Sequence, residues 1–85
     1  MLGQALILYN MNLMEAKLNK NCIVKQINVL DESTKIRLME LGLIECAKIV
    51  VKHKSILKKT LLIVFNSCAF TLKEDVAKMV VVDYE

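Results

Sequence analysis

Short apolar segments, separated by short polar stretches, limit what this chain can fold into. The segments are rich in Val, Ile and Leu and too short for core helices, so they favour β-strands. A chain of 85 residues holds a single domain. Short strands with tight connections in a domain of this size predict a partly open β-barrel. We expect strands at residues 22–30, 47–54, 61–65, 69–72 and 79–82.

Residues 31–41 predict the one substantial helix of the chain. Asp31 or Ser33 can cap its N-terminus, and the charge of Asp31 suits the positive end of the helix dipole. Gly42 follows the last apolar residue of the helix, where a left-handed C-cap is expected. One stripe of the helix is expected to face the core, and it consists of Thr34, Leu38 and Leu41.

Two further local signals lie in the C-terminal half. Asn66 and Ser67 are expected to form a tight turn between two strands. Thr71 is followed three positions later by Glu74, which matches a capping box and predicts a brief helical turn through about Lys78. The expected class is therefore mainly β, with one inserted helix.

The residue types that catalysis requires are scarce. A catalytic site needs a nucleophile, an acid–base group or a metal in a pocket. The chain has only two glycines and no Gly-rich phosphate loop. Its single histidine, His53, lies between Lys52 and Lys54, which favours a solvated strand end over a ligand. We therefore expect a binding protein without enzymatic activity.

Lysines gather in the second half of the chain, around His53. No acidic residue interrupts this cluster, which consists of Lys48, Lys52, Lys54, Lys58 and Lys59. One interpretation is a solvated hairpin that protects its strand edges. The other is a docking surface for an acidic protein. RNA is less favoured, and no nucleic-acid partner is expected, because no aromatic residues interleave the lysines.

Cysteine content and hydropathy favour a cytoplasmic protein. Cys22, Cys46 and Cys68 match no zinc or disulfide spacing, so we expect buried, reduced thiols. No apolar run approaches the roughly 20 residues of a membrane helix, and no direct membrane insertion is expected. The apolar start of the chain lacks the basic residue and the length of a signal peptide.

Three stretches resemble one known family. Residues 37–43, Arg-Leu-Met-Glu-Leu-Gly-Leu, resemble the Arg-Leu-Leu-Glu-Leu-Gly-Leu signature of FeoA, the ferrous iron transport protein A family. Residues 14–27 resemble that family's first turn and strand, and residues 70–77 its segment before the last strand. The resemblance implies an FeoA-like domain at 14–85 and an N-terminal extension at 1–13. Turn positions differ, with Glu45-Cys46 and Ser67 in place of Pro and Gly, so the chain is identified as a divergent member.

The resemblance implies a small SH3-like, partly open barrel and a role in ferrous iron uptake. FeoA proteins are cytosolic accessories of FeoB, the membrane iron transporter with a GTPase domain. The expected action is docking on the cytosolic GTPase region of FeoB and modulating its assembly or activity. The alternatives are a free-standing regulatory or metal-sensing domain, as at the C-terminus of iron-dependent repressors, and a small RNA-binding barrel. No cofactor is expected. Weak divalent-metal binding is left open, although the lysines beside His53 would repel a cation.

Strand alternation predicts where a partner binds. Alternate residues of a strand face the core, which places Ile49, Val51, Leu61, Ile63 and Phe65 inward. An apolar patch surrounded by charges is the usual anatomy of an interface, so we expect partner docking or self-association there. The alternative is that residues 1–13 cover this patch, or cover Ile36 and Met39 on the helix. The outward patch consists of Val50, Leu62 and Val64, with Lys52, Lys54, Lys58 and Lys59 around it or at the hairpin tip.

Overall fold

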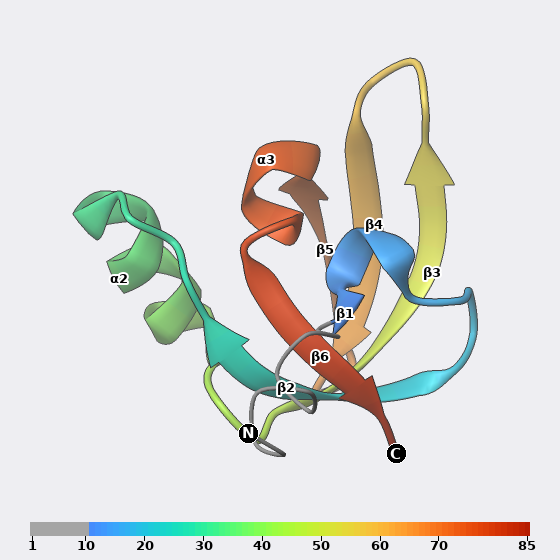
Figure 1. Cartoon of the computed structure of the whole chain (residues 1–85), viewed down its shortest axis with the longest axis horizontal. Helices are drawn as coiled ribbons and strands as arrows, with labels where there is room; N and C mark the ends of the chain where they lie inside the picture. The colour runs from blue at the N-terminus through green and yellow to red at the C-terminus, as the bar shows by residue number, and fades with distance from the viewer. Residues whose placement is uncertain (1–10) are drawn as a thin grey trace, which may run out of the picture.

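A curled, antiparallel six-stranded sheet forms most of the molecule in the computed structural model, which describes residues 11–85 (Figure 1). The strand order is β1-β6-β2-β3-β4-β5, so β1 and β5 are the edges and the barrel is not closed. The expected fold class is confirmed. The strands are β1 (Met11–Asn12), β2 (Asn21–Ile27), β3 (Lys48–Ser55), β4 (Thr60–Phe65), β5 (Cys68–Lys73) and β6 (Val80–Tyr84). The helices are η1 (Leu13–Glu15, a 3-10 turn), α2 (Glu32–Leu41) and α3 (Glu74–Ala77).

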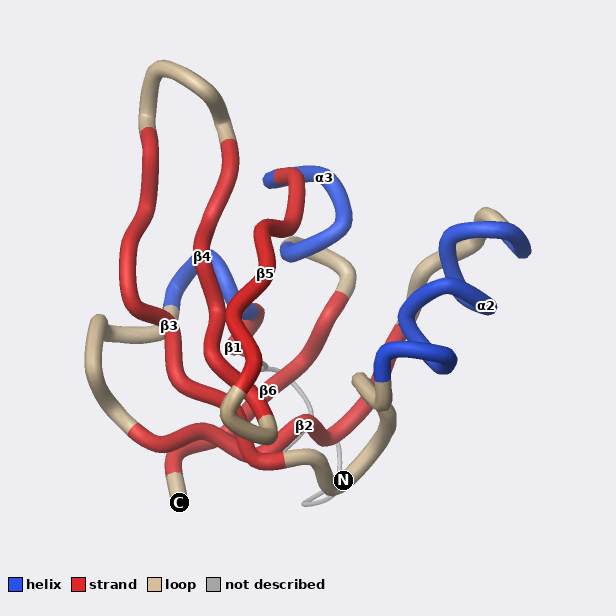
Figure 2. The backbone as a smooth tube through the Cα atoms, turned by 180° about the vertical axis from the view of Figure 1, so that it is seen from behind, coloured by secondary structure: helices blue, strands red, loops and turns tan. Residues whose placement is uncertain are grey.

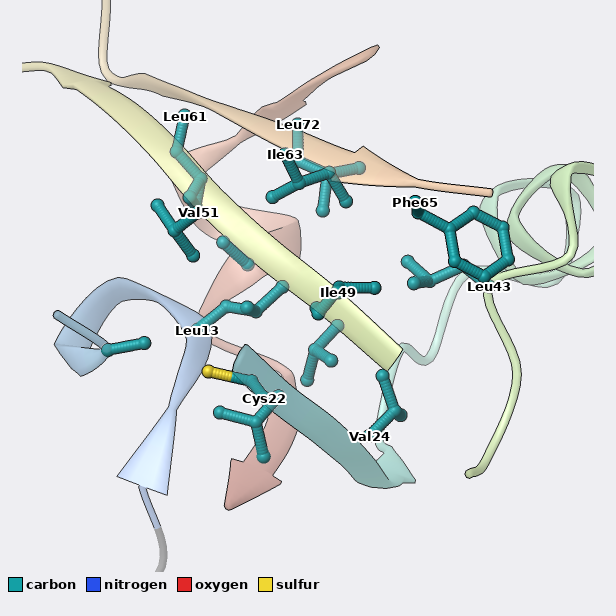
Figure 3. Packing of buried hydrophobic residues seen from close by; sticks show 14 of the residues in the cluster. Leu13, Cys22, Val24, Leu43, Ile49, Val51, Leu61, Ile63, Phe65 and Leu72 are labelled. Carbon is teal, nitrogen blue, oxygen red and sulfur yellow. The ribbon is translucent and has the colours of Figure 1, made fainter. Parts of the chain in front are cut away.

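The core fills the concave side of the sheet, and its side chains point toward one another in Figure 3. The five residues of β3 and β4 expected to face inward are all buried. Leu13 and Leu43 are fully buried beside them, one from η1 and one from the loop after α2. Leu13 lies in the segment that the sequence assigns to an N-terminal extension, so the described end of this segment contributes Met11 and Leu13 to the core.

The C-terminal end of α2 has the expected geometry. Gly42 has a φ of 92°, and its N–H donates to the carbonyl of Met39. The N–H of Leu43 donates to the carbonyl of Leu38 at 2.9 Å. These two bonds form a Schellman motif, in which the residues at the two ends of the longer bond make an apolar contact. The motif turns the chain from the helix directly into the core.

The predicted core-facing stripe of α2 is only partly correct. Leu38 is buried, whereas Leu41 is 46% exposed and Thr34 is half-buried. Figures 1 and 2 show α2 set to one side of the sheet rather than lying across it. A helix placed in this way buries little of its length. Leu38 and Leu43, in the loop after the helix, therefore connect α2 to the core, and no full apolar stripe is needed.

The predicted capping box at Thr71 is wrong, although a short helix does follow. Thr71 lies in β5, where it pairs with Leu62. The N-cap of α3 is Lys73, which makes no side-chain capping bond. The N–H of Glu74 donates instead to the carbonyl of Lys59 at 2.9 Å. Strand pairing therefore overrides the local helix-start signal.

The predicted tight turn at Asn66 and Ser67 is confirmed. Both residues have positive φ, 52° and 64°, and they join the paired residues Phe65 and Cys68. Positive φ at both central residues is typical of the turns that match the twist of a hairpin.

Asp31 caps α2 with its side chain, which makes the helix sensitive to acid. Its carboxylate accepts bonds from the Thr34 hydroxyl at 2.6 Å, the Thr34 N–H at 3.0 Å and the Ser33 hydroxyl at 3.1 Å. These bonds, first the one from the Thr34 hydroxyl, hold the pKa of Asp31 below its ordinary value. A depressed folded-state pKa stabilises the protein above the unfolded-state pKa of about 3.9, and this contribution is lost as the pH falls through the folded-state value.

We therefore expect Asp31→Asn to lose less stability than the parent protein between about pH 5 and pH 3. Asparagine still accepts the capping bond but does not titrate. Urea unfolding at a series of pH values measures the difference. Identical pH profiles for the two proteins would contradict a capping role for the charged form.

Candidate functional site

The outer face of the β3–β4–β5 sheet brings the predicted patch together. Val50 pairs with Val64 across β3 and β4, and all three residues of the predicted apolar patch are half-buried. Strand β5 extends the patch, because Ala69 pairs with Val64 and Thr71 pairs with Leu62. We call this surface the outer face. It consists of Val50, His53, Leu62, Val64, Ala69 and Thr71.

A shallow hollow lies at the end of the outer face that is nearer the hairpin tip. Its volume is about 380 Å³, and Leu62 contributes the apolar part of its lining. Lys58 lies at the rim, so a positive charge is next to exposed apolar surface. The hollow is lined by His53, Ser55, Lys58, Thr60, Leu62 and Thr71.

A β-bulge in β3 changes which lysines border this face. The pairing shifts between Val51 and His53, so the extra residue is Lys52. A bulge reverses the alternation beyond it. His53 therefore pairs with the outward Leu62, and Lys54 pairs with the buried Leu61.

Two of the four predicted lysines consequently make contacts away from the patch. The Lys54 ammonium donates to the carbonyl of Met14 at 2.7 Å, on the η1 side of β3. The Lys52 ammonium donates to the side-chain oxygen of Asn19 at 3.2 Å. Lys58 and Lys59 are exposed in the hairpin loop, near its tip. The structure thus separates Lys54 from the rim position that strict alternation predicted for it.

The hairpin tip carries two residues that sequence reasoning missed. Ile56 is 89% exposed and Leu57 is 97% exposed. They lie within the lysine cluster, and only the charge of that cluster was considered in the prediction. Two adjacent aliphatic residues within a turn were the signal that could have identified them.

A second apolar surface lies beside α2. A hollow of about 390 Å³ is lined by Ile27, Lys35, Met39, Ile44 and Glu45. Ile36 and Met39 are half exposed or more. The predicted cover for this surface and for the outer face was residues 1–13, and most of that segment lies outside the residues that the structure describes.

The three cysteines do not converge. Cys22 is buried in the core, and its burial, followed by the charge of Asp83, raises the pKa of its thiol. Cys46 and Cys68 are exposed, so the expectation of buried thiols is wrong for both. Cys46 lies in the turn before β3, and Cys68 is the first residue of β5. Within residues 11–85, no group of three or more His, Cys, Asp or Glu side chains could hold a metal ion.

No helix within residues 11–85 is long and apolar enough to cross a membrane. The architecture is that of a small SH3-like domain, an open antiparallel barrel with one inserted helix. The FeoA domain family model matches residues 11–84. The chain therefore belongs to the FeoA family, which is associated with ferrous iron transport. The match begins three residues before the domain boundary expected from the sequence, at the start of β1.

Solved structures support the same assignment. The FeoA protein of Chlorobium tepidum is 26% identical, with a TM-score of 0.79 over 87% of this chain and 70% of that one. FeoA of Stenotrophomonas maltophilia is 29% identical, with a TM-score of 0.73 over 86% of this chain and 89% of that one. That structure is a zinc complex, described as a prokaryotic SH3 domain protein and a proposed activating factor of ferrous iron transport. Among curated protein sequences, none matches this chain significantly.

Proposed function

We propose that this protein is a cytoplasmic accessory of ferrous iron uptake that docks through its outer face on the GTPase region of the FeoB transporter. The proposal assigns it a binding role and no reaction of its own. The observation that carries it is the outward-facing, half-buried apolar patch of Val50, Leu62 and Val64, bordered by Lys58. Membership of the FeoA family supports the link to iron transport.

The outer face has the composition of an interface rather than of a solvated sheet. An antiparallel sheet with one side in water normally places polar residues on that side. Here three aliphatic side chains occupy outward positions on adjacent strands. Their inward neighbours complete the core, so the hairpin is rigidly held and its outward residues are pre-positioned for a partner.

The charge around this face indicates the chemistry of the partner. No acidic residue occurs from Cys46 to Lys73, and Lys58 and Lys59 are exposed. Such a surface attracts an acidic partner and accelerates encounter with it. The metal-sensing alternative has less support, because residues 11–85 contain no candidate metal cluster.

Val64→Glu is expected to weaken binding to the purified GTPase region by about 30-fold or more, the effect of losing an interface hot spot. The fold should survive, because Val64 is outward and half-buried. Isothermal titration calorimetry measures the affinity, and circular dichroism checks the fold. Val81→Glu is the matched control, since Val81 is also half-buried but lies in β6, away from the hairpin.

The charge reversals Lys58→Glu and Lys59→Glu are expected to slow association, with a smaller effect at high salt. Normal binding by a folded Val64→Glu protein would exclude the outer face as the interface. Absence of binding by the parent protein would overturn the proposed partner. Loss of a parent dimer in the Val64→Glu protein would instead assign the outer face to self-association.

A further inference from the structure

The tip of the β3–β4 hairpin extends beyond the rest of the molecule in both backbone views (Figures 1 and 2). Ser55 and Thr60 form the last strand pair, and residues 56–59 make the turn. The turn is held in place by three features: the Lys58 N–H donates to the Ser55 hydroxyl at 3.3 Å, Lys59 has a φ of 53°, and the Lys59 carbonyl accepts the N–H of Glu74 at 2.9 Å. The tip is therefore a fixed projection.

The apex of this projection is aliphatic. Ile56 and Leu57 are 89% and 97% exposed, the values of side chains that make almost no contact with the rest of the protein. They therefore contribute little to the packing of residues 11–85. A turn normally carries Gly, Asn, Asp or Ser, which suit both its geometry and its exposure. Two consecutive aliphatic residues at such a position are available to contact an apolar environment outside this protein.

The charge next to the apex is positive. Lys58 and Lys59 follow Leu57 directly, and both are exposed. The first acidic residue after the hairpin in the sequence is Glu74, and its carboxylate is 3.7 Å from the ammonium of Lys78. Lys48, at the other end of β3, is paired with Glu85 at 3.0 Å. Neither of the two ion pairs found within residues 11–85 involves the tip lysines, so both lysines are available to an external anion.

We propose that this hairpin tip anchors the protein on an anionic lipid bilayer. Ile56 and Leu57 enter the boundary between headgroups and acyl chains, and Lys58 and Lys59 bind the lipid phosphates. Apolar side chains below the headgroups and lysines at their level are the arrangement of interfacial membrane anchors. The anchor is shallow and reversible, so it revises the expectation of no membrane insertion without requiring a spanning segment.

The shape of the tip favours a bilayer over a protein pocket. The apex is convex and narrow, and a fluid bilayer accommodates such a projection without a complementary cavity. Lysine is a flexible point charge, which suits laterally mobile phosphates, whereas fixed bidentate recognition favours arginine. The outer face lies on the body of the hairpin, so docking of a protein there and insertion of the tip use different apolar residues. The inference therefore does not rest on the proposed transporter partner.

Flotation of the purified full chain with vesicles tests this inference. We expect binding to vesicles containing phosphatidylglycerol in phosphatidylcholine, weaker binding to pure phosphatidylcholine, and a decrease with added salt. The double change Ile56→Ser with Leu57→Ser should reduce partitioning by about 30-fold or more. Its melting temperature should not fall, because both side chains are exposed. The double change Lys58→Ala with Lys59→Ala should reduce partitioning about 25-fold at low salt.

Leu57→Ser alone has a matched control in Leu30→Ser. Leu30 is 90% exposed but precedes α2, away from the tip lysines. Fluorescence adds a direct measurement, because the chain contains no tryptophan. Leu57→Trp should shift its emission to shorter wavelength on anionic vesicles, and Leu30→Trp should not.

Three results would overturn the inference. One is a parent protein that does not float with anionic vesicles. Another is loss of binding in the lysine variant together with normal binding in the Ile56→Ser, Leu57→Ser variant, which means electrostatic adsorption without insertion. The third is a tip variant that weakens binding to the GTPase region while the parent ignores vesicles, which assigns the tip to a protein interface. Val64→Glu should leave vesicle binding intact, so failure of the transporter proposal and failure of this one are distinguishable.

Discussion

Leu13→Ala is expected to lower the free energy of unfolding by about 3–5 kcal/mol, the upper part of the range for a buried leucine. Leu13 is fully buried and lies among core residues of β2 and β3 (Figure 3). Small domains are stable by only about 5–15 kcal/mol. The loss would therefore remove a large part of the total stability, from a residue at the very start of the described chain.

The position of Leu13 is fixed by hydrogen bonds as well as by packing. The Asn12 side chain accepts the N–H of Met14 at 2.8 Å, and the Glu15 carboxylate accepts the N–H of Asn12 at 2.9 Å. This capping box holds η1 in place. The Lys54 ammonium adds a bond to the Met14 carbonyl. A cavity at Leu13 cannot collapse easily, because its neighbours are fixed in this way.

Urea unfolding of the parent, Leu13→Ala and Leu18→Ala proteins measures this effect. Leu18 is 45% exposed, so its truncation should cost well under half as much. The slope of the unfolding free energy against urea concentration should be similar in all three proteins, because the surface exposed on unfolding changes little. If Leu13→Ala unfolds at the same urea concentration as Leu18→Ala, the segment before β2 is not part of the cooperative core.

The role of this segment could not be predicted from sequence alone. Its apolar pattern is broken by Asn10 and Asn12, and the family-like motifs begin at Met14. Local reasoning therefore assigned it to an extension. Asn12 is in fact the N-cap of η1, and β1 pairs with β6 from the opposite end of the chain. Such a long-range pairing leaves no periodic signal in two residues.

The β-bulge at Lys52 shows a second limit of pattern reasoning. Alternation correctly predicted which residues face inward along β4 and along β3 as far as Val51. An unpaired residue then shifted the alternation, so that Lys54 faces Met14 instead of a partner. Nothing in the sequence Val-Lys-His-Lys marks the bulge, because neither Gly nor Pro is present. The outer face was predictable, and its lysine border was not.

Predictions of helix caps and turns were correct where a single residue determines the backbone conformation. Gly42 was correctly assigned to the C-terminal end of α2, and Asp31 was one of two candidates, with Ser33, for its N-cap. Asn66-Ser67 was correctly assigned to a turn. The physical requirement is local in each case. The capping-box prediction at Thr71 was wrong because this residue can either cap a helix or pair in a strand. Its pairing with β4 was the stronger of the two.

Gly42→Ala is expected to destabilise the protein by about 2–4 kcal/mol, for two separate reasons. The φ of 92° strains any residue with a Cβ, at about 1 kcal/mol. A Cβ at this position would also lie 3.0 Å from Cζ and 3.1 Å from Cε2 of the Phe65 ring. Phe65 is buried and stacks edge-on against Phe70, so it cannot move away freely. Overpacking of this kind typically costs about 1–3 kcal/mol more.

A double-mutant cycle separates the two contributions. Phe65→Leu shortens the side chain and should relieve the clash, at the expense of some core packing. Gly42→Ala should then cost only about 1 kcal/mol in the Phe65→Leu background, the part that belongs to the backbone. Gly42→Asn provides a complementary control, because asparagine tolerates the left-handed conformation but still carries the Cβ that meets Phe65. Equal costs for Gly42→Ala in both backgrounds would show that backbone strain alone selects glycine here. A smaller cost in the Phe65→Leu background would show that the glycine also lets the end of α2 pack against the edge of the core.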